Sequence, residues 1–266
     1  MLSFCCVYVI FVLVKLVICF LHGGMIMAKM KSAELIAKAK DIAQNYKTAY
    51  IWGGLGRPIT EANIQDAINQ YSVNTKYAAG ARRYIGQPKA FFFDCVGLIK
   101  SILWGWCGDS SQNRGGAKYG SNGVPDMNAD TMISVCADVS TDFSNIVPGE
   151  ALWMSGHIGI YIGDGLCAES TPAWRGGVQI TAVANIGTKS GYNSRRWTKH
   201  GKLPYVDYSD QKVEKAEWEI TIENAVKDGV VTSPDYWRNV LSGKTKASAA
   251  NVKALMDKYH KVLESK

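Results

Sequence analysis

The segment Phe93-Asp94-Cys95-Val96-Gly97-Leu98-Ile99 places an acidic residue, a cysteine and an apolar run directly after one another. The apolar positions recur as far as Trp106, which predicts a buried helix over residues 95–106. Asp94 stands where a helix N-cap belongs, and Cys95 would then be the first helical residue. The segment therefore predicts a thiol at the N-terminus of a buried helix.

That position has a chemical meaning, because a cysteine attacks an amide only as its thiolate. A helix N-terminus and a neighbouring imidazolium are two common means of lowering the pKa of a thiol. Backbone N–H groups at a helix start also face the oxyanion that forms on attack. Cys95 is thus the candidate nucleophile, and we expect it to be the most alkylation-sensitive of the seven cysteines. A buried core cysteine is the alternative interpretation.

The residues that follow predict a sheet. Residues 107–147 are rich in Gly, Ser, Asn and Asp, so we expect a long loop with one small helix. Apolar stretches with the length of strands then occur at 151–154, 157–162, 166–169 and 178–183. His157 opens the second of these strands, where it would take the thiol proton from Cys95 and return it to the leaving amine. A surface histidine at a strand end is the alternative interpretation.

Helices flank this region on both sides. Apolar spacing predicts an amphipathic helix that begins at Ser32 as its N-cap, and a polar helix over 60–71. Further helix candidates occur at 219–225 and 251–263. The fold class is therefore α+β, with helices packed on a central antiparallel sheet and a helical tail. We expect an apolar segment at 1–27, a catalytic domain at 28–206, a linker at 207–215 and a helical module at 216–266.

A resemblance to a known family rests on three segments in order. They are Tyr50-Ile51-Trp52-Gly53-Gly54, the Phe93–Ile99 segment, and Pro148-Gly149-Glu150 followed by His157-Ile158-Gly159-Ile160-Tyr161-Ile162-Gly163. Together they resemble the NlpC/P60 family of papain-like cell-wall peptidases, over residues 33–206. The most specific feature is Asp-Cys-x-Gly-Leu with a later His-x-Gly-x-Tyr-x-Gly. The resemblance implies a papain-like fold in which Cys95 and His157 are the catalytic pair.

The family takes a third catalytic group from the next strand, twelve residues after the histidine, and that position is Glu169 here. Many relatives carry His, Asn or Gln there. A carboxylate at this position would orient the imidazole of His157 and stabilise the imidazolium more strongly. A solvated strand residue is the alternative interpretation of Glu169.

The hairpin that joins these two strands must place His157 and Glu169 on one face of the sheet. A two-residue turn at Asp164-Gly165 with a regular register would put them on opposite faces. A three-residue loop would pair Ile162 with Leu166 and put them on the same face. We therefore predict an odd loop or a bulge, most simply a three-residue loop with Gly165 in the left-handed region.

The resemblance also implies substrate contacts. Tyr50 matches a tyrosine that lines the substrate cleft in the family, although an ordinary core aromatic fits the sequence as well. Asp94 matches a residue that holds the free amino end of the peptide together with a serine after the nucleophile. This chain has Val96 instead, which leaves the specificity for a free amino end open. Trp174-Arg175 would contact the glycan or a stem-peptide carboxylate, or form a plain surface loop.

The resulting functional expectation is a peptidoglycan hydrolase that cleaves an amide of the stem peptide through a thioester on Cys95. It needs no metal and no organic cofactor. We expect a phage or prophage lysin that is made in the cytoplasm and acts at the cell wall outside it. The tail is similar to small helical modules of Gram-positive wall hydrolases, and in it Tyr236 and Trp237 form either a carbohydrate platform or a core. The alternatives are an N-acetylmuramoyl-L-alanine amidase with the same residues and a non-catalytic wall-binding protein.

The net charge, the cysteine pattern and the N-terminal residues indicate which partners to expect. The net charge of +7 suits a polyanion such as the cell wall, but the basic residues are scattered, so nucleic acid is not an expected partner. No CxxC pair supports a zinc knuckle or a disulfide scaffold. Residues 1–21 are apolar except for Lys15 and have three interpretations: sequence upstream of the true start at Met25 or Met27, a membrane anchor, or a cleaved signal. A membrane is a partner only in the anchor case.

Overall fold

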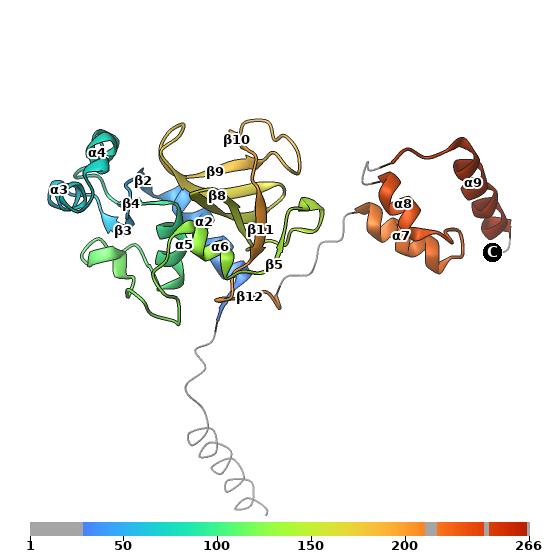
Figure 1. Ribbon diagram of the computed structural model, residues 1–266, viewed down its shortest axis with the longest axis horizontal. Helices are drawn as coiled ribbons and strands as arrows, with labels where there is room; N and C mark the ends of the chain where they lie inside the picture. Colours follow the sequence, from blue (N-terminus) through green and yellow to red (C-terminus); the bar gives the residue numbers. More distant parts are fainter. Residues whose placement is uncertain (1–28, 211–216, 242–244, 265–266) are drawn as a thin grey trace, which may run out of the picture.

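The computed structural model describes residues 29–210, 217–241 and 245–264 (Figure 1). The apolar segment 1–27, with its three interpretations, lies outside these residues. Within the described part of the chain, no helix combines the length and the hydrophobicity that a membrane crossing requires. The fold class expected from the sequence, α+β, is confirmed.

The larger sheet has seven strands in the order β10-β9-β8-β7-β6-β11-β5. Neighbouring strands pair antiparallel except β9 and β10, which are parallel, so the sheet is mixed and not wholly antiparallel as expected. The parallel pair arises because the chain after β9 loops back and runs alongside it in the same direction. The strands are β5 (Ala137–Ser140), β6 (Ala151–Met154), β7 (His157–Gly163), β8 (Leu166–Thr171), β9 (Gly177–Val183), β10 (Ser194–Arg195) and β11 (Lys199–Lys202).

Three helices pack around this sheet: α2 (Ser32–Asn45), α5 (Cys95–Leu103) and α6 (Ala129–Ser134) (Figure 1). The α5 helix contacts β7 and β8, and every one of its residues is buried. Its apolar side chains Leu98, Ile99 and Ile102 have no exposed surface. Burial of each such side chain contributes about 1.5–3 kcal/mol. The helix is therefore fixed rigidly where its N-terminus carries Cys95.

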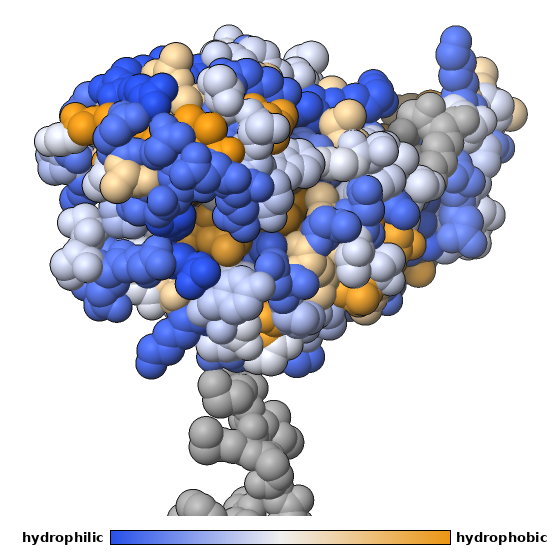
Figure 2. All heavy atoms as spheres, turned by 60° about the vertical axis from the view of Figure 1, so that its left-hand side comes forward, coloured by the Kyte–Doolittle hydropathy of each residue, from blue (hydrophilic) through white to orange (hydrophobic). Residues whose placement is uncertain are grey.

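A smaller sheet of order β2-β4-β3 lies beside α5. Its strands are β2 (Lys47–Tyr50), β3 (Leu55–Pro58) and β4 (Ala90–Phe93), and β4 leads directly into α5. The helices α3 (Glu61–Gln70) and α4 (Thr75–Arg82) follow β3 and contribute apolar side chains to a core shared with this sheet. Figure 2, with the side that carries α3 and α4 turned forward, shows a mostly hydrophilic surface with apolar groups in separate patches.

The start of α2 corrects one expectation. Ser32 is not the N-cap but a buried first helical residue, and its hydroxyl donates to Asp210 Oδ1 at 2.9 Å. The backbone N–H of Ala33 donates to Asp210 Oδ2 at 3.0 Å. Nearby, β12 (Val206–Asp207) pairs in parallel with β1 (Met30–Lys31). The packed unit thus continues through Asp210, into the stretch expected as a linker.

The described part of the C-terminal region holds three helices, α7 (Glu217–Lys227), α8 (Pro234–Leu241) and α9 (Ala249–Glu264). They include the helix candidates expected at 219–225 and 251–263. Trp237 lines an apolar cavity of about 360 Å³ between these helices, and its ring meets that of Tyr236 edge-on. The side chain of Trp237 is partly buried and forms part of the wall of this cavity.

Candidate active site

Cys95 is the first residue of α5, and Asp94 caps the helix as expected. Asp94 Oδ1 accepts a hydrogen bond from the backbone N–H of Gly97 at 2.5 Å, while Oδ2 accepts one from that of Gly53 at 2.8 Å. The carboxylate thus ties the loop after β2 to the helix start. A Cβ atom on Gly97 would lie 1.9 Å from the backbone oxygen of Gly54, so only glycine permits this approach.

The thiol of Cys95 is 5% exposed, and its environment differs from the sequence expectation. Burial, and after it the charge of the neighbouring Asp94 carboxylate, raise the pKa of Cys95 to about 12, although backbone N–H groups including that of Ile158 act to lower it. The expected lowering of the pKa by the helix N-terminus is therefore outweighed. The physical reason is that burial penalises the charged form of a thiol. The resting residue is a thiol.

The start of β7 lies against Cys95. The Sγ atom is 4.0 Å from the backbone oxygen of Gly156, and the N–H of Ile158 faces the sulfur. These two residues flank His157 in the chain. The structure therefore brings the predicted nucleophile to the strand end from which the predicted base projects.

His157 and Glu169 are joined directly: Nε2 of the imidazole lies 2.6 Å from Glu169 Oε2. The hairpin reaches this through a bulge. Gly163 pairs with Leu166 across a two-residue turn, but Tyr161 then pairs with Cys167, so Ile162 is an extra residue. The prediction of a three-residue loop, in which Ile162 pairs with Leu166, is therefore wrong. The bulge, which was predicted as the other solution, is present. Asp164 and Gly165 both have positive φ, 54° and 70°, as a tight hairpin turn requires.

Glu169 has no exposed surface and is surrounded by donors. Thr181 Oγ1 donates to Oε1 at 2.6 Å, and Arg195 Nε lies 3.1 Å from Oε1 and 2.9 Å from Oε2. Burial alone would raise the pKa of this carboxyl, but the hydrogen bond and charge of His157, then Arg195 and Thr181, lower it on balance. Glu169 is therefore a buried carboxylate.

Sequence reasoning missed Thr181, Arg195 and Trp197 as members of this cluster. The ring of Trp197 stacks on that of His157, with centroids 5.4 Å apart and planes at 11°. Arg195 reaches Glu169 because β10 pairs in parallel with β9, and a two-residue strand leaves no periodic signal in the sequence. The basic and aromatic run Arg195-Arg196-Trp197 was the one visible hint.

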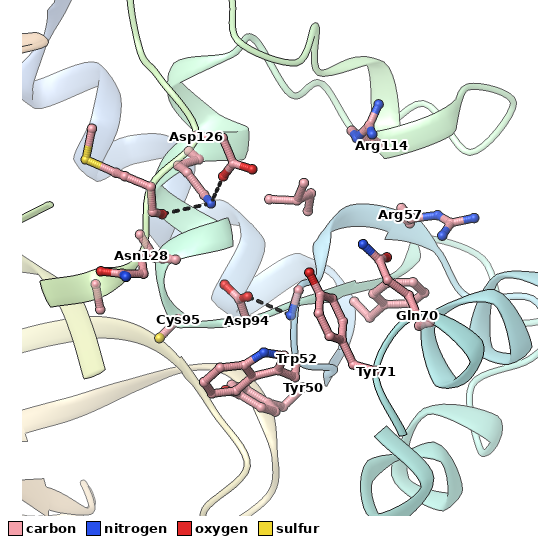
Figure 3. Close-up of a pocket in the computed structure, with 18 of the residues that line it drawn as sticks. Tyr50, Trp52, Arg57, Gln70, Tyr71, Asp94, Cys95, Arg114, Asp126 and Asn128 are labelled. Carbon is pink, nitrogen blue, oxygen red and sulfur yellow. Dashed lines mark hydrogen bonds and ion pairs between the residues drawn. The ribbon is translucent and has the colours of Figure 1, made fainter. Parts of the chain in front are cut away.

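A cleft of about 690 Å³ opens beside Cys95 (Figure 3). Figure 3 shows Cys95 toward one end, with Arg57 and Arg114 toward the other. Its walls come from the loop after β2, the end of α3 and the loop that precedes α6. The side chains that line it include Tyr50, Trp52, Arg57, Gln70, Tyr71, Asp94, Cys95, Lys100, Asn113, Arg114, Tyr119, Asp126, Asn128 and Asp130.

Of the four predicted substrate contacts, the cleft contains Tyr50 and Asp94. Burial raises the pKa of Tyr50, and the nearby Cys95 and Asp94 raise it further, so its hydroxyl keeps its proton. Trp174 and Arg175 lie outside the cleft lining. The Arg175 guanidinium donates to the backbone oxygens of Ala43, at 3.0 Å, and Val178, at 2.5 Å, and so joins the end of α2 to β9. Trp174 is 45% exposed, and the Arg195 guanidinium lies 5.0 Å from its ring centroid.

A buried histidine, His200, lies away from the cleft. His200 on β11 bonds through Nδ1 to the Glu150 carboxylate and through Nε2 to the backbone oxygen of Asp142 at 2.9 Å. Both partners are acceptors and raise the pKa of His200, which favours a proton on each ring nitrogen. In the described part of the chain, no group of three or more His, Cys, Asp or Glu side chains is placed to hold a metal ion.

The functional interpretation of this site rests on the residues described above. No protein family model matches the chain, and no curated protein matches it.

Proposed function

We propose that this chain is a papain-like cysteine hydrolase of the NlpC/P60 type that cleaves an amide bond in the stem peptide of peptidoglycan. The observation that carries the proposal is the cluster at the start of α5. A buried thiol lies against the strand end of a histidine whose imidazole bonds to a buried carboxylate. This is the arrangement of a nucleophile, a base and a group that orients the base.

The bond to Glu169 occupies Nε2 of His157 and leaves Nδ1 as the ring nitrogen for the thiol. On attack, the Cys95 proton passes to Nδ1 and the sulfur bonds to the substrate carbonyl carbon. The oxyanion is stabilised by backbone N–H groups at the start of α5. The proton then passes to the leaving amine, whose C–N bond breaks, and a thioester remains. Water, deprotonated by His157, hydrolyses the thioester and restores the thiol.

The raised pKa of Cys95 fits this sequence of steps. A thiol with a pKa of about 12 is almost wholly protonated at neutral pH. Its thiolate therefore forms by proton transfer to His157 as the sulfur attacks an electrophile in the cleft. Glu169 stabilises the imidazolium produced by that transfer, because it is already ionised and bonded to the ring.

The wall as substrate is supported by the resemblance of the motifs and by charge. The net charge of +7 favours a polyanionic surface such as a teichoic-acid-bearing wall. In this proposal the protein is a phage or prophage lysin, the partner is peptidoglycan, and the helical module is a wall-binding appendage. The side chain of Val96 offers no hydrogen bond beside Asp94, so recognition of a free amino end on the substrate is not part of the proposal.

The test is digestion of purified peptidoglycan with the full chain, followed by mass spectrometry of the products. New amino and carboxyl ends within the stem peptide are expected. Release of whole stem peptides from the sugar would instead identify the alternative, an N-acetylmuramoyl-L-alanine amidase. Cys95→Ala should abolish product formation, whereas Cys107→Ala, which changes an exposed cysteine, should not. Equal lysis by Cys95→Ala would contradict the proposal.

A further inference from the structure

Three aromatic side chains on the cleft walls remain exposed. Trp52 is 48% exposed, Tyr71 41% and Tyr119 53%, and all three line the cavity that contains Cys95. Large apolar groups are usually buried on folding, and an exposed set around one cleft is typical of a binding site. The stem peptide does not account for them, since its side chains are short or charged and offer no broad apolar face.

The wall formed by Trp52 and Tyr71 is held in place by buried contacts. Asn74 has no exposed surface, accepts from the backbone N–H of Trp52 at 2.8 Å and donates to its backbone oxygen at 3.0 Å. The ring of Tyr71 lies over Gly53, where a Cβ atom would come within 2.7 Å of the ring. The exposed indole therefore projects from a fixed backbone, which reduces the entropy lost when a ligand binds.

The opposite wall is fixed as well. The hydroxyl of Tyr119 donates to Asp126 at 2.7 Å, and its ring lies 5.0 Å from the ring of Trp104. The guanidinium of Arg114 lies 5.0 Å from the ring centroid of Tyr119. Asp126 is in turn paired with Lys100. Amide side chains that line the same cleft are Gln70, Asn113 and Asn128.

Flat aromatic faces combined with amide and guanidinium groups match one class of ligand. A pyranose ring presents a face of C–H groups that stacks on an aromatic ring, and its hydroxyl and acetamido groups exchange hydrogen bonds with amides and guanidinium. We propose that the cleft binds an N-acetylated sugar of the glycan strand between the walls formed by Trp52, Tyr71 and Tyr119. This inference rests on the proposed function. It adds that the stem peptide is cleaved while it is still attached to the glycan strand.

The first experiment measures binding without catalysis. The full chain with Cys95→Ala is titrated with the peptide-free disaccharide GlcNAc-MurNAc, and the indole N–H signal of Trp52 is followed by NMR. Saturable movement of that signal is expected. In the same background, Trp52→Ala or Tyr119→Ala should weaken binding about tenfold, a loss of about 1.4 kcal/mol. Tyr192→Ala is the control, because Tyr192 is 43% exposed but lies outside the cleft lining, and it should change nothing.

Absence of disaccharide binding to the Cys95→Ala chain would overturn the inference. Equal weakening by Tyr192→Ala and Tyr119→Ala would overturn it too, as would binding of a hydrophobic peptide in place of the sugar. Having two variants on opposite walls keeps the test decisive if one of them fails to fold.

The second experiment separates this inference from the proposed function. The intact chain is compared on glycan-linked and free stem peptides of the same sequence, and Trp52→Ala should lower kcat/KM about tenfold on the linked substrate alone. If the disaccharide binds but no wall is cut, the proposed hydrolase fails and the sugar site stands. If wall is cut but the disaccharide does not bind, the sugar site fails and the hydrolase stands.

Discussion

At the scale of single residues, the Glu169 carboxylate holds the imidazole of His157 through a direct hydrogen bond. The carboxylate is buried without exposed surface and shares its two oxygens among His157, Thr181 and Arg195. Arg195 offsets the negative charge on one side, so the histidine need not be an imidazolium for the carboxylate to remain ionised. An unpaired buried charge costs free energy. Removal of Arg195 would therefore leave His157 to compensate the negative charge of Glu169.

Arg195→Met tests this positioning role. We expect kcat for peptidoglycan digestion to fall with KM unchanged, because Glu169 would hold the protonated His157 ring as its remaining cationic partner and slow proton transfer from it. Stability should fall by about 3–5 kcal/mol, as for other broken buried ion pairs. Steady-state kinetics on purified peptidoglycan give kcat and KM, and chemical denaturation gives the free energy of unfolding. Arg196→Met, at an exposed neighbouring position, should leave both unchanged.

The reactivity of Cys95 gives a second prediction at this scale. Its surroundings raise the thiol pKa to about 12, so labelling by iodoacetamide at neutral pH depends on proton transfer to His157. We expect Cys95 to be labelled at pH 7 in the native chain. In His157→Ala, labelling should appear only under strongly alkaline conditions. Mass spectrometry of the labelled peptides decides this. Equal labelling at neutral pH with and without the imidazole would mean that His157 is not the base.

At the scale of elements, the close approach of the loop after β2 to α5 shapes the site. Gly97 lies where a Cβ atom would meet the Gly54 carbonyl, and Asp94 bridges the same two elements. Gly80 on α4 is a contrast, because a Cβ atom there would meet nothing within 4 Å. The two helical glycines therefore differ in what a Cβ atom would meet.

Opposite stability effects should follow from the same substitution. Gly97→Ala forces the loop away from α5, and we expect it to lose more than about 2 kcal/mol, as other overpacked core sites do, together with hydrolytic activity. Gly80→Ala should gain about 0.5–1 kcal/mol through helix propensity and keep activity. Denaturant unfolding measures the stability of each variant, and digestion of purified peptidoglycan measures its activity. Similar stabilities for both variants would show that the approach of the loop is not restrictive.

The hairpin and β10 show how far the sequence predicts elements. Local patterns predicted β6 to β9 and α5 closely, because alternation, capping and turn residues act over a few neighbours. The bulge at Ile162 depends on a choice between two turns that share the same glycines, and the sequence did not decide it. The small sheet around β4 and the short β10 depend on pairing between distant segments. Arg195 was missed for that reason.

At the scale of the whole molecule, stability depends on pH through His200. Burial lowers its pKa, but the hydrogen bond to Glu150, the Asp142 carbonyl and the charge of Glu150 outweigh burial and raise it above the ordinary 6.5. A raised pKa in the folded state means that the stabilisation is fully present below pH 6.5. It is lost as pH rises through the folded-state value.

Thermal unfolding of the full chain should show this dependence. We expect the midpoint to decline as pH rises above neutrality, and His200→Gln to remove most of the decline while lowering stability at pH 6. The variant lies away from the cleft, so hydrolysis at pH 6 should persist. A native chain whose midpoint does not vary between pH 6 and pH 9 would contradict the charged state of His200.

The meeting of β1 with β12 and the bonds of Asp210 to the start of α2 have a mechanical consequence. Force applied between the two ends of the packed unit over residues 29–210 would first load this short pairing and the two Asp210 hydrogen bonds. The core around α5 would be loaded only afterwards. The pairing of β1 with β12 and the Asp210 hydrogen bonds would therefore break under force before the geometry at Cys95 changes.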